Sequence, residues 1–437
     1  MRLSDHLSKA TWSFADKALY AGYGFVRLVQ VHAMAKQEFG VFSVFDTAFM
    51  ILFTLSDGYI LQALVKFGAD ENRRGETLTI TFAAHVAFLT IASFLLVLFR
   101  APLAGLFQEP RYIDVLTAMP LLCILTVPRT YGLKFFQMLI RTREIFFIDF
   151  AFFGTMAVAT AYRLYTHTFN TADDFIAVNI AGAIGGSVVA IALAAPHARF
   201  HLRIKKNSVR EMAPFGFYQG SAVLTTILQQ YADVFILQYF SNAAQVANYA
   251  SARIFYRAFE SVRDAVTTIL YPAVARLHVQ RRFAEMRVLV EKTMSFVLIA
   301  MIPVVVFCEL GGSAFLFHLF FGMKYDESIP IFNVLALFGL ILPFILNFNV
   351  LTGLGESKPI FRIAIIASLA SLIGNFILVP QFQAMGAAYT LIFASIVSGA
   401  LATREVKKSV PFTWISLFRG VGDGMEFVKK RFCSAKS

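Results

Sequence analysis

Long stretches without a charged residue recur along this chain and constrain its fold more than any other feature. The clearest run from Leu78 to Phe99, from Phe175 to Ala195 and from Ile329 to Leu354. A helix that crosses a bilayer needs about 17–25 predominantly apolar residues. Only 15% of the residues are charged, against about 25% in an average soluble chain. The sequence therefore predicts a multi-pass integral membrane protein and argues against a soluble all-α domain.

The hydropathy pattern predicts an all-α fold of about twelve transmembrane helices. They are expected near residues 12–33, 40–63, 77–99, 113–135, 145–165, 174–195, 213–239, 245–274, 292–311, 328–351, 361–380 and 384–403. A basic linker, residues 197–212, would separate an N-terminal six-helix lobe (1–196) from a C-terminal one (213–403). Six helices per half would make the lobes a parallel repeat.

Lys and Arg are distributed unequally over the predicted loops. The N-terminus, the loops after even-numbered helices and the tail carry 28 of them, whereas the other loops carry 5. Basic residues near helix ends are retained in the cytoplasm, so both termini are expected there. The net charge of +12 is then a topological signal and a contact surface for anionic lipids. Its spread over short loops does not fit a nucleic-acid-binding module.

Both ends of the chain lie outside the predicted bundle. The start, MRLSDHLSKATW, lacks the apolar run of a signal peptide, so the first helix is expected to remain uncleaved. The tail, residues 404–437, is expected on the cytoplasmic face. Beyond Val410 it mixes aromatic with basic residues, which predicts an interfacial amphipathic segment; a disordered basic tail is the alternative.

Motifs for catalysis or for a cofactor are missing from the sequence. There is no phosphate-binding loop of the ATPase type, and the eight His residues are isolated. Cys123, Cys308 and Cys433 form neither a metal-binding spacing nor a disulfide framework. Every predicted loop is short, whereas membrane enzymes that act on sugars usually carry long catalytic loops. A carrier without a metal or cofactor is therefore expected rather than an enzyme.

Charged side chains within predicted helices mark the candidate site, because a charge in the bilayer usually faces a wet cavity or a bundle interior. At about 100° per residue, polar residues share one face on four helices. These faces comprise Asp16, Tyr20, Tyr23, Arg27 and Gln30 on the first helix, Asp46 and Asp57 on the second, Gln219, Thr226, Gln230 and Asp233 on the seventh, and Arg253, Arg257, Glu260 and Asp264 on the eighth.

The arginines on these faces suit an anionic head group, because a guanidinium stays charged and donates paired hydrogen bonds to phosphate. The candidates for binding it are Arg27, Arg253, Arg257 and Arg129. Candidate counter-ions or coupling residues are Asp16, Asp46, Asp233 and Glu260. Two alternatives stay open. Glu260 and Asp264 lie within reach of Arg257 and Arg263 along one helix, and Arg129 follows Pro128 near a helix end, where a long side chain can snorkel. Lys17 and Arg263 fit structural roles better.

Several segments resemble the polysaccharide transporter family, the O-antigen-type flippases. They are EFGVFSVFDTAFMILFTLSDGYILQALVKFGA (38–69), DVFILQYFSNAAQVANYASARIFYRAFESV (233–262), LYPAVARLH (270–278) and LTGLGESKPIFRIAIIASLASLIGNFILVPQFQAMGAAYTLIFASIVSG (351–399). The resemblance implies the fold of multidrug and oligosaccharide exporters, with two six-helix bundles around a V-shaped cavity. It also implies that a polyprenyl-diphosphate saccharide is flipped by alternating access.

The resemblance extends to cavity residues. Lipid II flippases line their cavity with arginines on helices 1, 2 and 8, and Arg27, Arg253 and Arg257 match the first and last of these helices. The second helix departs from that pattern, because it offers Asp46 and Asp57 instead of an arginine. The chain also lacks the two extra helices of lipid II flippases. Both departures favour an O-antigen or exopolysaccharide repeat unit as cargo.

The expected function is a flippase that moves a lipid-linked oligosaccharide from the cytoplasmic to the periplasmic leaflet of a bacterial inner membrane. Expected partners are this substrate, anionic lipids and a polysaccharide polymerase or glycosyltransferase complex, and the protein is expected to be a monomer. Two alternatives remain. One is an ion-coupled multidrug exporter of the same superfamily, and the other is a non-transporting scaffold of a polysaccharide assembly complex.

Overall fold

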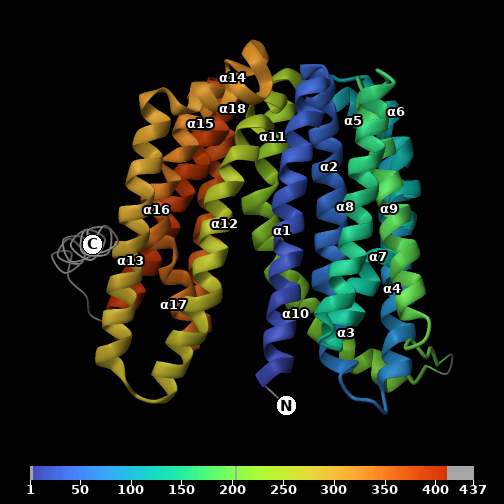
Figure 1. Cartoon of the computed structure of the whole chain (residues 1–437), viewed down its shortest axis with the longest axis vertical. Coiled ribbons are helices and arrows are strands. Elements are labelled where there is room, and N and C mark those ends of the chain that lie inside the picture. The colour runs from blue at the N-terminus through green and yellow to red at the C-terminus, as the bar shows by residue number, and fades with distance from the viewer. Residues whose placement is uncertain (1–2, 202–203, 411–437) are drawn as a thin grey trace, which may run out of the picture. The chain divides into compact units, whose positions relative to one another are not determined.

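A computed structural model describes residues 3–201 and 204–410, and no strand occurs among them. The chain forms two compact units, Met1–Ala247 and Asn248–Ser437. Within each unit the long helices run side by side (Figure 1). The boundary between the units falls near the start of one long helix, whereas the sequence suggested a division at residues 197–212. The two six-helix lobes stay a prediction.

The described part of the first unit consists of helices joined by short connections. They are α1 (Leu3–Ala33), α2 (Lys36–Ser56), the π-helix η1 (Asp57–Leu61), α3 (Gln62–Phe67), α4 (Arg74–Leu98), α5 (Arg100–Leu106), α6 (Arg111–Val115), the 3₁₀-helix η2 (Leu116–Ala118), α7 (Met119–Met138), α8 (Thr142–Tyr165), α9 (Ala172–Ala194), α10 (Lys206–Gln230) and α11 (Ala232–Phe240).

The second unit begins within α12 and includes most of that helix. Its elements are α12 (Ala243–Val279), α13 (Phe283–Phe307), the π-helix η3 (Cys308–Gly312), α14 (Ser313–Phe321), the 3₁₀-helix η4 (Gly322–Tyr325), α15 (Ser328–Ala336), α16 (Phe338–Ile345), α17 (Asn347–Leu354) and α18 (Ser357–Ser409). The predicted amphipathic segment after Val410 lies outside the described residues.

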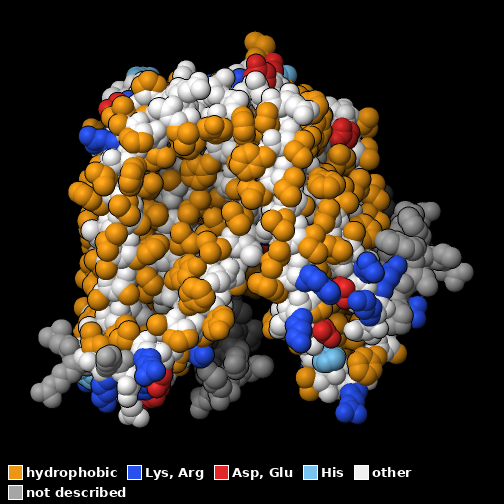
Figure 2. Space-filling model, turned by 180° about the vertical axis from the view of Figure 1, so that it is seen from behind, with side chains coloured by type: hydrophobic (Ala, Val, Ile, Leu, Met, Phe, Trp, Pro, Cys, Tyr) orange, Lys and Arg blue, Asp and Glu red, His pale blue; other side chains and the backbone are white. Residues whose placement is uncertain are grey.

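Eight helical segments of the described chain are long and apolar enough to cross a membrane. On the face shown in Figure 2, hydrophobic side chains cover the middle of each unit, and most Lys and Arg residues lie toward one end. This pattern is the one that a bilayer requires, because lipid cannot solvate charges. The multi-pass membrane class predicted from the sequence is confirmed; the count of twelve spans and the cytoplasmic side of the termini stay predictions.

The last of these segments, α18, is 53 residues long and is broken at Gln383, whose φ of 50° and ψ of −127° are not helical. A straight helix of that length would reach about 80 Å, far more than the hydrocarbon core of about 30 Å. The break lies between residues 361–380 and 384–403, where the sequence predicts two separate helices. The single long segment α18 thus contains both predicted helices.

The helix predicted over residues 213–239 is also divided. α10 ends at Gln230 and α11 begins at Ala232, because Tyr231 between them has φ −128° and ψ −19°. Gln219, Thr226 and Gln230 lie on α10, whereas Asp233 lies in the first turn of α11. The single polar face predicted for this helix is therefore interrupted before it reaches Asp233.

Close packing in the first unit depends on small residues. A Cβ atom added to Gly216 would lie 2.2 Å from the carbonyl oxygen of Tyr59 in η1, and one added to Gly220 would lie 2.2 Å from the Tyr59 ring. These two glycines let α10 approach η1 without a side chain between the backbones. In a membrane, such close van der Waals contact replaces the hydrophobic effect as the force that joins helices.

We expect Gly40→Ala to destabilise the protein by about 1–3 kcal/mol, the usual cost of overpacking. An added Cβ at Gly40 in α2 would lie 1.7 Å from the carbonyl oxygen of Ala243. This oxygen belongs to the backbone, so a change of side-chain rotamer cannot relieve the clash. Thermal unfolding of the detergent-solubilised protein measures the effect. Gly154→Ala in α8 is the matched control, since its Cβ would have no neighbour within 4 Å. Equal melting temperatures of the two variants would contradict the expectation.

Candidate functional site

The polar face predicted for the first helix lies on α1, which packs against α8. Two of its members, Asp16 and Gln30, are buried. The side-chain amide of Gln30 donates a 2.7 Å hydrogen bond to the hydroxyl of Thr160 on α8. Tyr20 is partly exposed, and its hydroxyl donates to Asp149 on α8 at 3.3 Å. The face of α1 is therefore held on α8 by polar contacts that the sequence pattern did not assign to partners.

Arg27 on this face forms an ion pair with Asp46 of α2, with 3.0 Å between Nη2 and Oδ2. The two side chains are 15% and 20% exposed. The guanidinium also lies over the rings of Phe42 and Phe175, at 4.9 and 4.4 Å from their centroids. Those rings are stacked at 3.9 Å. Asp46 thus has the geometry of a counter-ion, and a role in coupling stays a prediction.

A second buried arginine, Arg129 of α7, contacts Asp149 of α8 at 2.5 Å. Their side chains are 11% and 2% exposed, so Arg129 does not snorkel to a helix end. Its guanidinium lies 3.7 Å from the ring centroid of Phe152. Asp16 of α1, which is 8% exposed, interacts electrostatically with Asp149 and Arg129. The structure thus gathers two predicted residues, Arg129 and Asp16, around Asp149, which the sequence analysis did not single out.

Two further polar groups were also missed. Lys134 of α7 contacts Asp57 of η1 at 2.7 Å. His85 of α4 is fully buried, and its two ring nitrogens contact the hydroxyls of Ser56 at 2.6 Å and Thr130 at 3.0 Å. A lone polar residue in an apolar helix is the signal that could have identified Asp149 and His85.

The stripe predicted for the eighth helix lies on α12. Arg253 is half-buried, with its guanidinium 5.7 Å from the ring centroid of Tyr249, while Arg257 is exposed and Glu260 half-buried. Arg263 lies about 120° round the helix from Arg257 and pairs with Asp264 at 3.0 Å. A structural role for Arg263 stays a prediction.

The opposite side of α12 anchors this helix within the second unit. Asn248 donates a 2.6 Å hydrogen bond to Glu327, and the hydroxyl of Ser251 donates at 2.9 Å to that of Ser328 at the start of α15. Both α12 residues are fully buried. At about 100° per residue, Arg253 and Arg257 lie on the side of α12 opposite Asn248 and Ser251. The hydrogen bonds of the buried Asn248 and Ser251 therefore determine the direction in which the arginines point.

Asp233 of α11 is 3% exposed, and its Oδ1 accepts a 2.8 Å hydrogen bond from the backbone N–H of Val234. This contact satisfies one backbone N–H in the first turn of α11. A role as counter-ion or coupling residue stays a prediction. Among residues 3–201 and 204–410, no group of three or more His, Cys, Asp and Glu side chains could hold a metal ion.

Comparison with known proteins adds the family to this geometry. Residues 32–330, more than half of the chain, match the family described as polysaccharide biosynthesis proteins. The chain belongs to this family. The resemblance inferred from the sequence segments is thereby confirmed. An uncharacterized membrane protein of Methanocaldococcus jannaschii is 24% identical over 217 residues, 48% of this chain and 42% of that protein. The chain thus spans less than half the length of this relative.

Solved structures of transporters share the fold of this family member. The lipid II flippase MurJ in an inward closed conformation has a TM-score of 0.73 at 13% identity, and the match covers 98% of this chain and 93% of that chain. A multidrug resistance MATE transporter of the MOP superfamily, in an inward-facing conformation, has a TM-score of 0.75 at 12% identity, with 89% and 94% covered. At such identities the likeness shows the fold alone, which is one used by flippases and exporters.

Proposed function

We propose that this family member is a flippase for a polyprenyl-diphosphate-linked oligosaccharide, an O-antigen or exopolysaccharide repeat unit, which it moves from the cytoplasmic to the periplasmic leaflet of a bacterial inner membrane. The observation that carries the proposal is the polarity of three long helices. In the described chain, α1, α10 and α12 are 31, 25 and 37 residues long, long enough to span a bilayer, but none is among the apolar spans.

Polar helices in a membrane bundle face either protein or water, because lipid cannot solvate their side chains. α1 and α12 are also the helices that carry Arg27, Arg253 and Arg257. In the proposal each of these helices turns its polar face to water, and the guanidinium groups bind the diphosphate. The sugars stay in water, and the polyprenyl chain stays in lipid. Alternating access needs no ATPase motif, since the membrane potential acts on a bound charge with about 2.3 kcal/mol per 100 mV.

The four candidate arginines are not equivalent in this proposal. Arg129 forms an ion pair with the carboxylate of Asp149, which is almost inaccessible to solvent. Its role in the proposal is therefore to join α7 to α8 and not to bind cargo. Arg27 retains one carboxylate partner and a partly exposed side chain. Arg257 is exposed on α12. The proposed diphosphate-binding set is therefore Arg27, Arg253 and Arg257, and the transporter acts as a monomer that hands cargo to a polymerase or glycosyltransferase complex.

The test is mass spectrometry of lipids that copurify with gently solubilised protein. We expect the wild type to retain a polyprenyl-diphosphate saccharide and Arg257→Gln to retain roughly tenfold less, since a hydrogen bond to a charged group contributes about 1.5–3 kcal/mol. Arg263→Gln is the matched control, because it removes the same charge from another side of the same helix. Equal retention in both variants would remove Arg257 from the binding site.

A cellular assay separates the alternatives. Surface polysaccharide should be lost with Arg257→Gln and kept with Arg263→Gln, while both proteins reach the membrane. Normal polysaccharide in cells that lack the protein, together with drug resistance when it is expressed, would instead identify a multidrug exporter. Normal export with Arg27, Arg253 and Arg257 all neutralised would identify a scaffold.

A further inference from the structure

A groove of about 620 Å³ lies on the second unit between α16 and the last part of α18. α18 contributes Ile396, Ala400, Thr403, Arg404 and Lys407, and α16 contributes Leu340, Ile341 and Phe344. Ile396, Ala400, Arg404 and Lys407 follow one another at intervals of three or four positions, and Thr403 is adjacent to Arg404, so they form one stripe along the helix. The volume is in the range of about 300–1,000 Å³ that is usual for sites that bind small molecules.

Packing between the two helices explains why the groove exists. A Cβ atom on Gly399 would lie 3.2 Å from the Cβ of Phe344, so the backbone of α18 approaches α16 closely there. The amide of Asn347, the first residue of α17, donates a 2.9 Å hydrogen bond to the hydroxyl of Thr403 on α18, so α18 is also fixed to α17 at the groove. Next to these contacts, Ala400 has only a methyl group, which leaves the space open.

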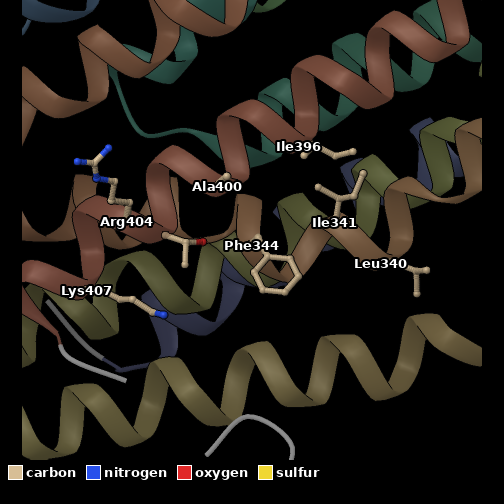
Figure 3. Close-up of a pocket in the computed structure, with 8 residues that line it drawn as sticks. Leu340, Ile341, Phe344, Ile396, Ala400, Arg404 and Lys407 are labelled. Atoms are coloured by element: carbon tan, nitrogen blue, oxygen red, sulfur yellow. The ribbon is translucent and has the colours of Figure 1, made fainter. Parts of the chain in front are cut away.

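The groove has an apolar end and a cationic end. Figure 3 shows Arg404 and Lys407 at one end of the lining and Leu340, Ile341 and Ile396 at the other, with Phe344 between them. From residue 396 to residue 407 a helix rises about 16 Å. Ile396 is 49% exposed, so the apolar end opens to the surface. This distribution matches one amphiphile, with a hydrocarbon chain and an anionic head.

The charge around the groove is decidedly positive. Glu405, which follows Arg404 in the sequence, contacts Arg362 at 3.2 Å and Lys408 at 2.7 Å. Neither of these two cations lines the groove. The two charged side chains that do line it, Arg404 and Lys407, are both cations.

We propose that this groove binds one anionic phospholipid, with an acyl chain along α16 and Ile396 and its phosphate at Arg404 and Lys407. The apolar lining alone would not select a lipid, because every membrane lipid offers hydrocarbon. Selection comes from the cations, since basic pockets between transmembrane helices bind anionic head groups. The tail beyond Val410 is the competing occupant, but it carries five Lys and Arg against two acidic residues, so its charge opposes that of the groove. The inference is independent of the cargo proposed above.

Native mass spectrometry of the full chain in detergent tests this site with phosphatidylglycerol and phosphatidylcholine of identical acyl chains. We expect one phosphatidylglycerol to bind roughly tenfold more tightly than phosphatidylcholine, as two membrane-facing cations suggest. Arg404→Gln/Lys407→Gln should abolish the preference. Arg281→Gln/Lys358→Gln is the matched control: it removes the same charge from exposed positions of the second unit that neither line the groove nor pair with Glu405, and it should retain the preference.

The remaining outcomes separate the site from its alternatives. Ala400→Trp keeps all charges but fills the groove, so it should also remove the bound lipid. Equal losses in the two double variants would indicate diffuse attraction and overturn the site. Displacement of the lipid by glycerol phosphate at equal concentration would show an anion site without a lipid. With Ala400→Cys, an oxidative crosslink to the chain's own Cys433 or to a second copy would place a protein segment in the groove and overturn the proposal.

Discussion

Replacing Arg129 with methionine is expected to lower the free energy of unfolding by about 3–5 kcal/mol, the cost of breaking a buried ion pair by removing one partner. The variant would leave Asp149, which is 2% exposed, without its cation. Asp16 would stay buried beside it, so two neighbouring carboxylates would lose the guanidinium that both interact with. The hydrogen bond from the Tyr20 hydroxyl to Asp149 is too weak to replace a guanidinium.

Thermal or denaturant unfolding of the solubilised protein measures this loss. Arg282→Met is the matched control, because Arg282 pairs with Glu285 at 49% and 56% exposure, and such surface pairs contribute about 0–1 kcal/mol. Adding Asp149→Asn to Arg129→Met should recover a large part of the stability, since a neutral amide needs no cation. A single variant as stable as the wild type, or a double variant less stable than the single one, would contradict a buried pair.

The sequence predicts which faces of the helices are polar. This prediction uses only the helical period of about 100° per residue and does not depend on which helices pack together. Arg27 and Asp46 could therefore be recognised as inward-facing residues on adjacent helices. Their pairing needed the structure, since a helical face specifies a direction and several acidic residues share it. In the structure Asp46 is the carboxylate that contacts Arg27.

Arg129 shows where this reasoning stops. Its partner Asp149 is the lone acidic residue of an apolar stretch in α8, and no repeat or spacing connects it with Arg129 in α7. The break at Tyr231 between α10 and α11 was missed for a similar reason. No Gly or Pro marks it, so the residues around it read as one continuous helix.

A polar cluster at the starts of α2, α6 and α9 was not predicted either. Arg111 contacts Glu38 at 3.0 Å and Asp173 at 2.7 Å, and Glu38 accepts a hydrogen bond from the backbone N–H of Ala172. The three charges come from the starts of three helices that are far apart in sequence. Hydropathy assigns such residues to loops, and only the packing of α2, α6 and α9 brings them together.

Neutralising Arg27 as Arg27→Ala is expected to abolish transport, roughly a 100-fold loss if two charge-assisted hydrogen bonds to the diphosphate are removed. The same substitution also leaves Asp46 without its 3.0 Å partner and empties the place over Phe42 and Phe175. A transport defect alone would therefore not distinguish binding of cargo from loss of structure.

Exchanging the pair as Arg27→Asp/Asp46→Arg resolves this ambiguity. The exchange restores an ion pair between α1 and α2, and we expect the melting temperature to return most of the way to that of the wild type. Transport should stay lost, because the cation would then project from α2 and no longer from the polar face of α1. Surface polysaccharide and thermal unfolding, measured on the same three proteins, report the two properties separately. Recovery of both would make Arg27 a purely structural residue and leave the diphosphate to Arg253 and Arg257, whereas recovery of stability alone would assign Arg27 to the cargo.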